Sequence, residues 1–221
     1  MAFLGEEQAF KVMINFNPWW STGAIPKEMN KPVKRVAFYS VEKALMHPKL
    51  RRIVFLSGAR RVGKTTLMYQ VIGELLGRGV PPKRILYLSY DHPVLKFFDI
   101  GQLVELFSNN VAGNGEDELY LFFDEIQYAG NWDTWLKVLY DQNPRYRIMV
   151  TGSALPLSTR GMESGVGRWV TVKIPTLSFY EYIELIGAAE RPLLPSGIKP
   201  TKLCHLDKSA LASVMLQLSG L

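Results

Sequence analysis

The 221-residue sequence predicts an α/β fold, a three-layer αβα sandwich built around a parallel five-stranded sheet. Short apolar segments rich in β-branched and aromatic residues alternate with longer segments whose apolar residues recur at helical spacing. This alternation is typical of a parallel sheet covered by helices on both faces. The strand segments are also apolar at consecutive positions, as strands buried on both faces must be.

The predicted strands and helices follow one another in a regular order. Strand patterns lie at 51–58, 84–90, 119–123, 147–153 and 169–174. Apolar residues at helical spacing are found at 36–47, 67–76, 100–111, 131–141 and 178–185. Glycines and prolines in GRGVPP end the second of these helices, and Ser178 with Glu181 forms a capping box that begins the last.

Both ends of the chain differ from this central pattern. Residues 1–35 are expected to form an irregular arm, because three prolines and a glycine interrupt its second half. Trp19 and Trp20 are too apolar to be left in water, so this N-terminal arm should pack on the core. Residues 36–186 would form the main domain. Residues 187–221 would be a proline-containing linker and the start of a truncated C-terminal region.

Composition narrows the class of protein. No run of about 18 apolar residues is present, and the start MAFLGEEQAF does not resemble a signal peptide, so we expect a cytoplasmic protein that does not enter membranes. The only cysteine, Cys204, excludes an intramolecular disulfide. The net charge is +6, and residues 1–61 hold eleven basic against four acidic residues. This excess is either a surface for an anionic partner or a solvated basic face.

The most informative motif lies at 58–65, where GARRVGKT matches G-x-x-x-x-G-K-[ST] in full. Gly58 and Gly63 let the backbone curl so that its N–H groups surround phosphates, and the following helix adds its dipole. Lys64 is predicted to reach the β- and γ-phosphates, and Thr65 to bind Mg²⁺ through its hydroxyl. The other predicted nucleotide contacts are Arg61, Val62 and Thr66. The side chains of Arg60 and Arg61 could touch phosphate, a partner or DNA, or simply be solvated.

An acid pair follows the third predicted strand in LYLFFDEIQ. Asp124 at the tip of a buried strand is the predicted magnesium residue. Glu125 beside it could orient and deprotonate an attacking water, which favours hydrolysis over phosphate transfer to a substrate. A further predicted strand, 84–90, lies between the phosphate loop and this acid pair. That arrangement indicates the ATPase branch with an added central strand, in the order 5-1-4-3-2.

Three further polar residues are weaker candidates. Ser153, at the end of the fourth predicted strand, could bind the attacking water or the γ-phosphate, or it could be an ordinary strand cap. Arg160 and Arg168 lie in a glycine-rich segment, and either could complete this chain's site or a neighbour's site as an arginine finger. The alternative is a flexible surface loop.

In their order, several motifs resemble archaeal-type AAA ATPases, which are P-loop ATPases with a DEIQ signature. The motifs are FNPWW, GARRVGKTTLMYQVI, GVPPKRILYLSYDHP, LYLFFDEIQ, WLKVLYD, VTGSA, GR and LSFYEY. The resemblance covers roughly residues 13–185. The resemblance implies an AAA-like fold that binds and hydrolyses ATP with Mg²⁺. It assigns magnesium and water roles to Asp124 and Glu125, and the GR arginine to Arg168. The nucleotide contacts that it assigns are Gly58, Gly63, Lys64 and Thr65. Members usually continue into a C-terminal domain, which suggests a truncated or isolated module here.

Two functions therefore follow from the sequence. The first is an Mg²⁺-dependent ATPase that acts as a motor or switch, with a catalytic set of Lys64, Glu125, Ser153 and Arg168. The alternative is a nucleotide-gated binding module with little turnover, associated with DNA. Expected ligands and partners are ATP, Mg²⁺, a DNA or protein partner, and further copies of the same chain.

Overall fold

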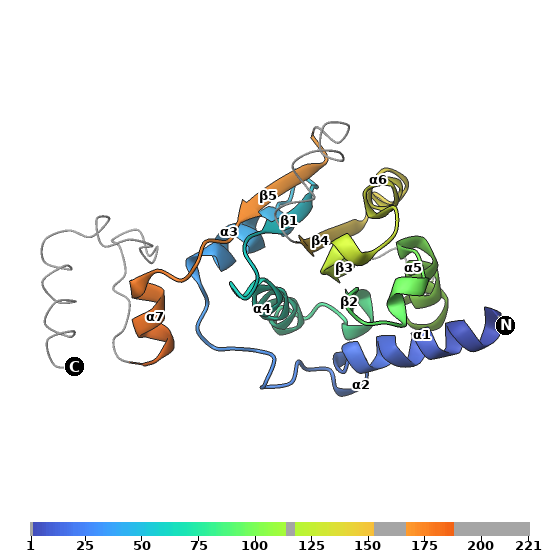
Figure 1. The fold of residues 1–221 in the computed structure, drawn as a ribbon, viewed down its shortest axis with the longest axis horizontal. Coiled ribbons are helices and arrows are strands. Elements are labelled where there is room, and N and C mark those ends of the chain that lie inside the picture. Colours follow the sequence, from blue (N-terminus) through green and yellow to red (C-terminus); the bar gives the residue numbers. More distant parts are fainter. Residues whose placement is uncertain (1, 114–117, 153–166, 188–221) are drawn as a thin grey trace, which may run out of the picture.

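The computed structural model describes residues 2–113, 118–152 and 167–187. Its centre is a parallel five-stranded sheet of β1 (Ile53–Ser57), β2 (Ile85–Ser89), β3 (Leu119–Asp124), β4 (Tyr146–Gly152) and β5 (Trp169–Lys173). The strands lie in the order β2-β3-β4-β1-β5 (Figure 1). Read from the other edge this is 5-1-4-3-2, so the predicted fold class is confirmed.

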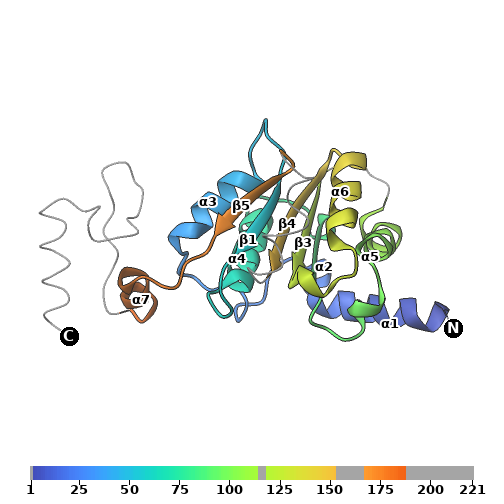
Figure 2. The ribbon, with the colours of Figure 1, turned by 45° about the horizontal axis from the view of Figure 1, so that its top comes forward.

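Helices cover both faces of the sheet, as Figure 2 shows. One face packs against α1, α5 and α6, and the other against α3 and α4. Alternation along β1 explains this division, because Ile53 and Phe55 belong to the first core and Val54 and Leu56 to the second. The helices are α1 (Ala2–Phe16), α2 (Trp19–Thr22), α3 (Val36–Leu45), α4 (Lys64–Gly77), α5 (Ile100–Phe107), α6 (Trp132–Gln142) and α7 (Phe179–Leu185).

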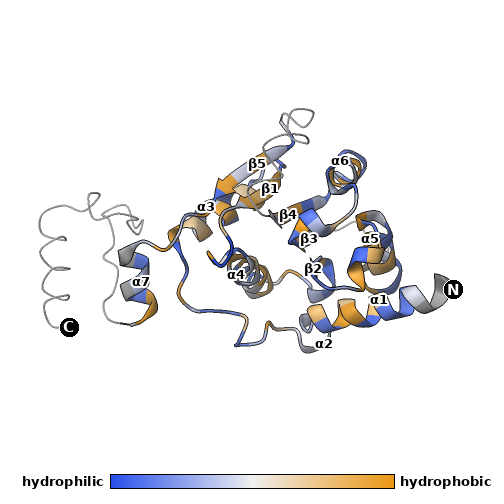
Figure 3. Cartoon of the chain, in the orientation of Figure 1, coloured by the Kyte–Doolittle hydropathy of each residue, from blue (hydrophilic) through white to orange (hydrophobic). Residues whose placement is uncertain are grey.

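Short non-α turns complete the connections between these elements. Three are 3₁₀ turns, η1 (Pro82–Arg84), η2 (Leu95–Phe97) and η4 (Ile126–Tyr128), and one is a π-helical turn, η3 (Ser108–Ala112). The predicted helix at 100–111 therefore ends as an α-helix at Phe107 and widens into η3. Figure 3 shows hydrophobic and hydrophilic residues together on α5, as its amphipathic pattern predicts. Within the described ranges, no helix is both long and apolar enough to cross a bilayer.

The prediction of an irregular N-terminal arm is wrong for residues 2–16, which form α1. All three prolines of the arm lie after Asn17, so none interrupts this segment. Ala9 and Met13 are fully buried at helical spacing and join the core beneath α5. Burial of this apolar stripe stabilises a helix that the prolines further along would have argued against. The domain boundaries proposed from the sequence stay predictions.

The edge of β2 is closed by side chains rather than by another strand. The Asn17 amide donates to the carbonyl of Tyr87 at 2.8 Å and accepts from its N–H at 2.7 Å, as a neighbouring strand would. The indole N–H groups of Trp19 and Trp20 both donate to the carbonyl of Ile85, at 3.1 and 2.8 Å. An exposed strand edge invites pairing with other chains. The NPWW segment thus serves to satisfy and cover this edge.

Candidate nucleotide site

The phosphate loop connects the end of β1 to the start of α4, at the carboxyl edge of the sheet. Each of its two glycines is needed for a different structural reason. A Cβ at Gly58 would lie 2.5 Å from the backbone oxygen of Ile174, so no larger residue fits there without displacing the chain. Gly63 has φ +91° and is the N-cap of α4. Arg61 also takes a left-handed conformation, with φ 64°, which is uncommon for a residue with a Cβ. These constraints hold the loop curled around the helix N-terminus.

The side chain of Lys64 folds back over the phosphate loop that precedes it in the sequence. Its ammonium group donates to the carbonyls of Gly58 at 3.1 Å and Ala59 at 2.9 Å, and the residue is almost fully buried. A buried ammonium group needs such acceptors, because desolvation without them is costly. Phosphate oxygens are stronger acceptors than carbonyls, since they carry charge. The arrangement therefore presents a cation that can exchange its loop contacts for a bound phosphate.

Asp124 is the meeting point of three hydroxyl groups. Thr65 donates to its carboxylate at 2.6 Å and Tyr87 at 3.0 Å, and Thr151 makes a further short hydrogen bond. The structure thus brings together Thr65 and Asp124, the two residues predicted for magnesium. A hydroxyl and a carboxylate are hard oxygen ligands of the kind that Mg²⁺ prefers. In the described part of the chain no cluster of three His, Cys, Asp or Glu residues could replace this pair.

Tyr87 and Thr151 are site residues that the sequence reasoning missed. Tyr87 belongs to β2, on the sheet face that packs against α4, and its ring centroid lies 4.8 Å from that of Tyr69. Burial, together with the charge of Asp124, raises the pKa of the Tyr87 hydroxyl well above its ordinary value. This phenol therefore stays a hydrogen-bond donor at any physiological pH. The sequence offered only a weak signal, a tyrosine in the mainly apolar strand segment RILYLSY, which also contains other polar residues.

For the Mg²⁺-dependent hydrolysis that we propose for this site, we expect Tyr87→Phe to raise the Mg²⁺ concentration needed for half-maximal turnover about tenfold, since residues that orient a metal ligand typically contribute this much. The ring and its packing are kept, so stability should change little. The measurement is a Mg²⁺ titration of phosphate release. Tyr120→Phe is the matched control, because that hydroxyl bonds to Glu118 near the other end of β3. An unchanged Mg²⁺ requirement in Tyr87→Phe would refute the positioning role.

Glu125 directly follows the sheet and is held by its neighbours. Its φ is 51°, a left-handed conformation that turns the chain sharply away from β3. Its amide donates to the hydroxyl of Thr151 at 3.0 Å, and its carboxylate accepts a short hydrogen bond from Gln127. The side chain is only partly buried, so water can reach it. Strained residues of this kind cluster at functional sites. Gln127, the last residue of DEIQ, was not among the predicted site residues.

The remaining predicted site residues are Ser153, Arg160 and Arg168. Ser153 and Arg160 are outside the described residues. The backbone oxygen of Arg168 accepts from Ile53 at 2.8 Å, which places it at the amino edge of the sheet. The phosphate loop is at the other end of β1, and five residues of strand span about 16 Å. The guanidinium of Arg168 forms a bidentate pair with Asp141 of α6, at 2.9 and 3.0 Å. β1 therefore lies between Arg168 and the phosphate loop of the same chain, and the role predicted for Arg168 stays a prediction.

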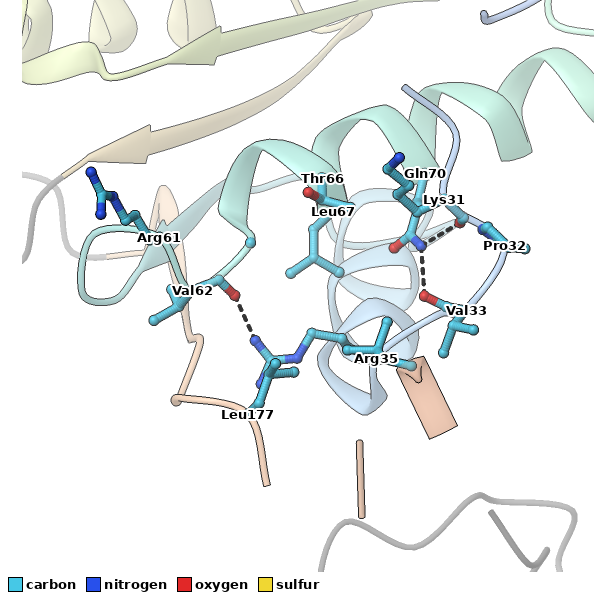
Figure 4. Close-up of a pocket in the computed structure, with 12 residues that line it drawn as sticks. Lys31, Pro32, Val33, Arg35, Arg61, Val62, Thr66, Leu67, Gln70 and Leu177 are labelled. Atoms are coloured by element: carbon cyan, nitrogen blue, oxygen red, sulfur yellow. Dashed lines mark hydrogen bonds between the residues drawn. The ribbon is translucent and has the colours of Figure 1, made fainter. Parts of the chain in front are cut away.

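A cavity of about 370 Å³ opens beside the phosphate loop. The end of the N-terminal arm, the loop, one side of α4 and the region of α7 form its walls (Figure 4). Most of the lining is apolar, contributed by residues such as Val33, Leu67, Leu177 and Leu185. Arg35 closes one wall, where its guanidinium donates to the Val62 carbonyl of the loop at 2.7 Å. The cavity therefore has a size and polarity suited to a flat aromatic group next to bound phosphates.

Comparison with known proteins agrees with this geometry. A family model described as an AAA domain matches residues 50–183, more than half of the chain. The chain therefore belongs to this AAA domain family and has the fold of its P-loop ATPases. Membership implies nucleotide binding. The resemblance seen in the sequence motifs is confirmed at this level, and the finer assignment to an archaeal type with a DEIQ signature stays a prediction.

The individual proteins whose sequences match this chain are distant relatives. Uncharacterized protein MJ1637 of Methanocaldococcus jannaschii is 31% identical over 169 residues, which cover 74% of this chain and 35% of that protein. An uncharacterized protein of Haemophilus influenzae is 28% identical over 135 residues, which cover 59% of this chain and 33% of that one. The chain thus spans about a third of the length of these relatives.

Solved structures that resemble the backbone of this chain include AMPPCP-bound DnaA from Aquifex aeolicus. It has a TM-score of 0.47 and 19% identity and covers 92% of this chain and 65% of DnaA. A point variant of RuvB from Thermotoga maritima has a TM-score of 0.43 and 24% identity and covers 73% of this chain and 49% of RuvB. We draw no conclusion on function from likenesses of this size.

Proposed function

We propose that this protein binds ATP together with Mg²⁺ and hydrolyses its β–γ phosphoanhydride. One observation carries the proposal: the hydroxyl of Thr65, in the phosphate loop, lies 2.6 Å from the carboxylate of Asp124, and Glu125 follows immediately. A phosphate cradle, a cation site and a potential base therefore share one edge of the sheet. Hydrolysis of a nucleoside triphosphate needs these three parts in contact.

In the proposed complex the phosphates lie on the backbone N–H groups of the loop, between Gly58 and Thr65. Lys64 releases the carbonyls of Gly58 and Ala59 and binds the β- and γ-phosphates instead. The base enters the cavity beside α4. Thr65 and Asp124 would hold Mg²⁺, which supplies charge neutralisation between the β- and γ-phosphates when bound. Tyr87 and Thr151 would keep the Asp124 carboxylate oriented when the ion is bound.

Glu125 supplies the base for the chemical step. Its carboxylate accepts a proton from a water molecule, whose oxygen then attacks the γ-phosphorus as the bond to the β-γ bridging oxygen breaks. The products are ADP and inorganic phosphate. The amide of Gln127 donates a hydrogen bond to this carboxylate and so fixes its direction. Release of that contact on nucleotide binding would link the site to η4.

A motor or switch must act on a partner molecule. Exposed arginines in the phosphate loop support a partner that binds beside it. Arg60 and Arg61 are both exposed, and Arg61 also lines the cavity beside the loop. DNA, a protein or a second copy of the chain could meet them. Arg168 could serve such a neighbouring copy only after leaving Asp141. These roles rest on charge and exposure alone.

The test is phosphate release from ATP by the purified chain, with and without Mg²⁺, alongside equilibrium nucleotide binding. We expect turnover that requires Mg²⁺ and is abolished in Lys64→Ala. Binding without turnover in the wild type would favour the nucleotide-gated binding module instead. A chain that binds no nucleotide would overturn both readings.

A further inference from the structure

The amide of Gln70 is fixed in one orientation at the wall of the cavity. Gln70 lies on α4, two turns after the phosphate loop, and only 2% of the residue is exposed. Its nitrogen donates to the carbonyls of Lys31 at 2.7 Å and Val33 at 2.9 Å. Carbonyl oxygens can only accept hydrogen bonds, so the nitrogen must face them and the oxygen must face the other way. The chemistry of these two neighbours therefore sets the direction of the amide.

The amide oxygen is left as an acceptor without a partner. Figure 4 shows it turned away from the two carbonyls, on the side of Leu67, and the residue lines the cavity. No donor from the described ranges reaches this oxygen. An acceptor held in an apolar wall favours a ligand that brings a donor and disfavours one that brings another acceptor.

Other polar groups around the cavity are less suited to this task. The Arg35 guanidinium is engaged with Glu181, with Val62 and with the backbone oxygens of Pro175 and Thr176. Lys31 and Arg61 are exposed cations at the rim, where ribose or phosphate would meet them. Gln70 is thus a buried residue of the cavity lining whose amide is held in one direction by two hydrogen bonds, which leaves its oxygen to accept from a ligand.

We propose that Gln70 determines base specificity by accepting a hydrogen bond from the exocyclic amine of a 6-aminopurine. The inference rests on the proposed function, because it takes the phosphate loop to hold a nucleotide whose base occupies the cavity. Adenine offers an amino donor at position 6, whereas hypoxanthine and guanine offer an oxygen there. Two acceptors facing each other in an apolar wall leave both unpaired, and sites built in this way discriminate strongly.

The test compares ATP with inosine triphosphate (ITP), which replaces the 6-amino group by an oxygen, as competitors of a ribose-labelled fluorescent ADP in the presence of Mg²⁺. The wild-type chain is expected to bind ATP at least about tenfold more tightly than ITP. Gln70→Met removes the acceptor at similar length. It should weaken ATP binding until the ratio of the two affinities is within about twofold of one, with ITP affinity nearly unchanged.

Gln70→Glu is the matched variant, because it keeps an acceptor oxygen but, like Gln70→Met, loses the bonds to Lys31 and Val33. It should retain a preference for ATP. If both variants lose the preference for ATP over ITP, the hydrogen bonds from Gln70 to Lys31 and Val33 determine that preference. Our inference would then be overturned. Equal wild-type affinity for ATP and ITP also overturns it while leaving the proposed ATPase intact. Failure to bind either nucleotide would instead refute the proposed function. Thermal unfolding of each variant establishes that it is folded.

Discussion

Glu125→Gln should bind ATP with nearly wild-type affinity and hydrolyse it at least about a hundredfold more slowly. A positioned general base contributes a factor of about 10²–10⁴, and an amide cannot take the proton from water. The substitution keeps the shape of the side chain and removes only the proton acceptor, so the curled backbone at this position should be preserved. Single-turnover phosphate release together with nucleotide binding would separate the chemical step from affinity.

Glu105→Gln provides the control for this experiment. Glu105 lies on α5 and is exposed, so its substitution removes the same charge away from the nucleotide. It should hydrolyse ATP at the wild-type rate. If Glu125→Gln also does so, another group activates the water, and the role proposed for the acid pair is wrong. A loss of ATP binding in Glu125→Gln would point to a damaged loop instead.

Arg35→Ala should lower the free energy of unfolding by about 3–5 kcal/mol, because it leaves a buried carboxylate without its partner. The Arg35 and Glu181 side chains are 8% and 7% exposed and meet at 3.0 Å. The same guanidinium binds the Val62 carbonyl of the phosphate loop. Nucleotide affinity should therefore fall as well. Denaturant unfolding and nucleotide titration measure the two effects.

The control for the ion pair is the Arg35→Ala, Glu181→Ala double variant. It should be less destabilised than the sum of the two single variants, because no unpaired buried charge remains. Strict additivity would show that the two side chains contribute independently. For comparison, exposed ion pairs such as Lys11 and Glu7 typically contribute less than about 1 kcal/mol to the free energy of unfolding.

This pair also predicts how stability depends on pH. Burial by itself would raise the pKa of Glu181, but hydrogen bonds from Arg35 and Ser178 and the charge of Arg35 outweigh it and lower the pKa below its ordinary value of 4.5. The stabilisation is therefore present at neutral pH and is lost as the pH falls below about 4.5. In Arg35→Ala this acid dependence should be shallower, which unfolding curves at several acidic pH values would reveal.

Much of the fold and of the site could be predicted from local sequence. Five short apolar strands alternating with amphipathic helices specify a parallel sheet, since parallel strands need crossovers. The phosphate loop could likewise be recognised, because its whole motif is one contiguous stretch from Gly58 to Thr65. The acid pair is readable for a similar reason. A charged residue at the end of a buried strand has few structural explanations.

Other features depend on which segments meet in space. Residues 2–16 precede the three prolines of the arm, so those prolines do not bear on their conformation. Their helix is stabilised by burial of Ala9 and Met13 in the core that α5 also joins. Arg168 follows a glycine-rich segment that reads as part of the site, yet the parallel register with Ile53 places it at the far edge of the sheet. Ser153 stays a prediction, because it lies outside the described ranges.

The sequence alone therefore determines the chemistry of the phosphate loop and acid pair and the class of sheet that carries them, because these depend on neighbouring residues in the chain. The tertiary structure decides which distant side chains serve them. Tyr87 reaches Asp124 from 37 residues away, Arg35 joins the loop to Glu181 across 146, and Gln70 acquires its direction from carbonyls 37 and 39 positions earlier. Such contacts leave no local pattern, because only the packing of strands and helices brings their partners within hydrogen-bond distance.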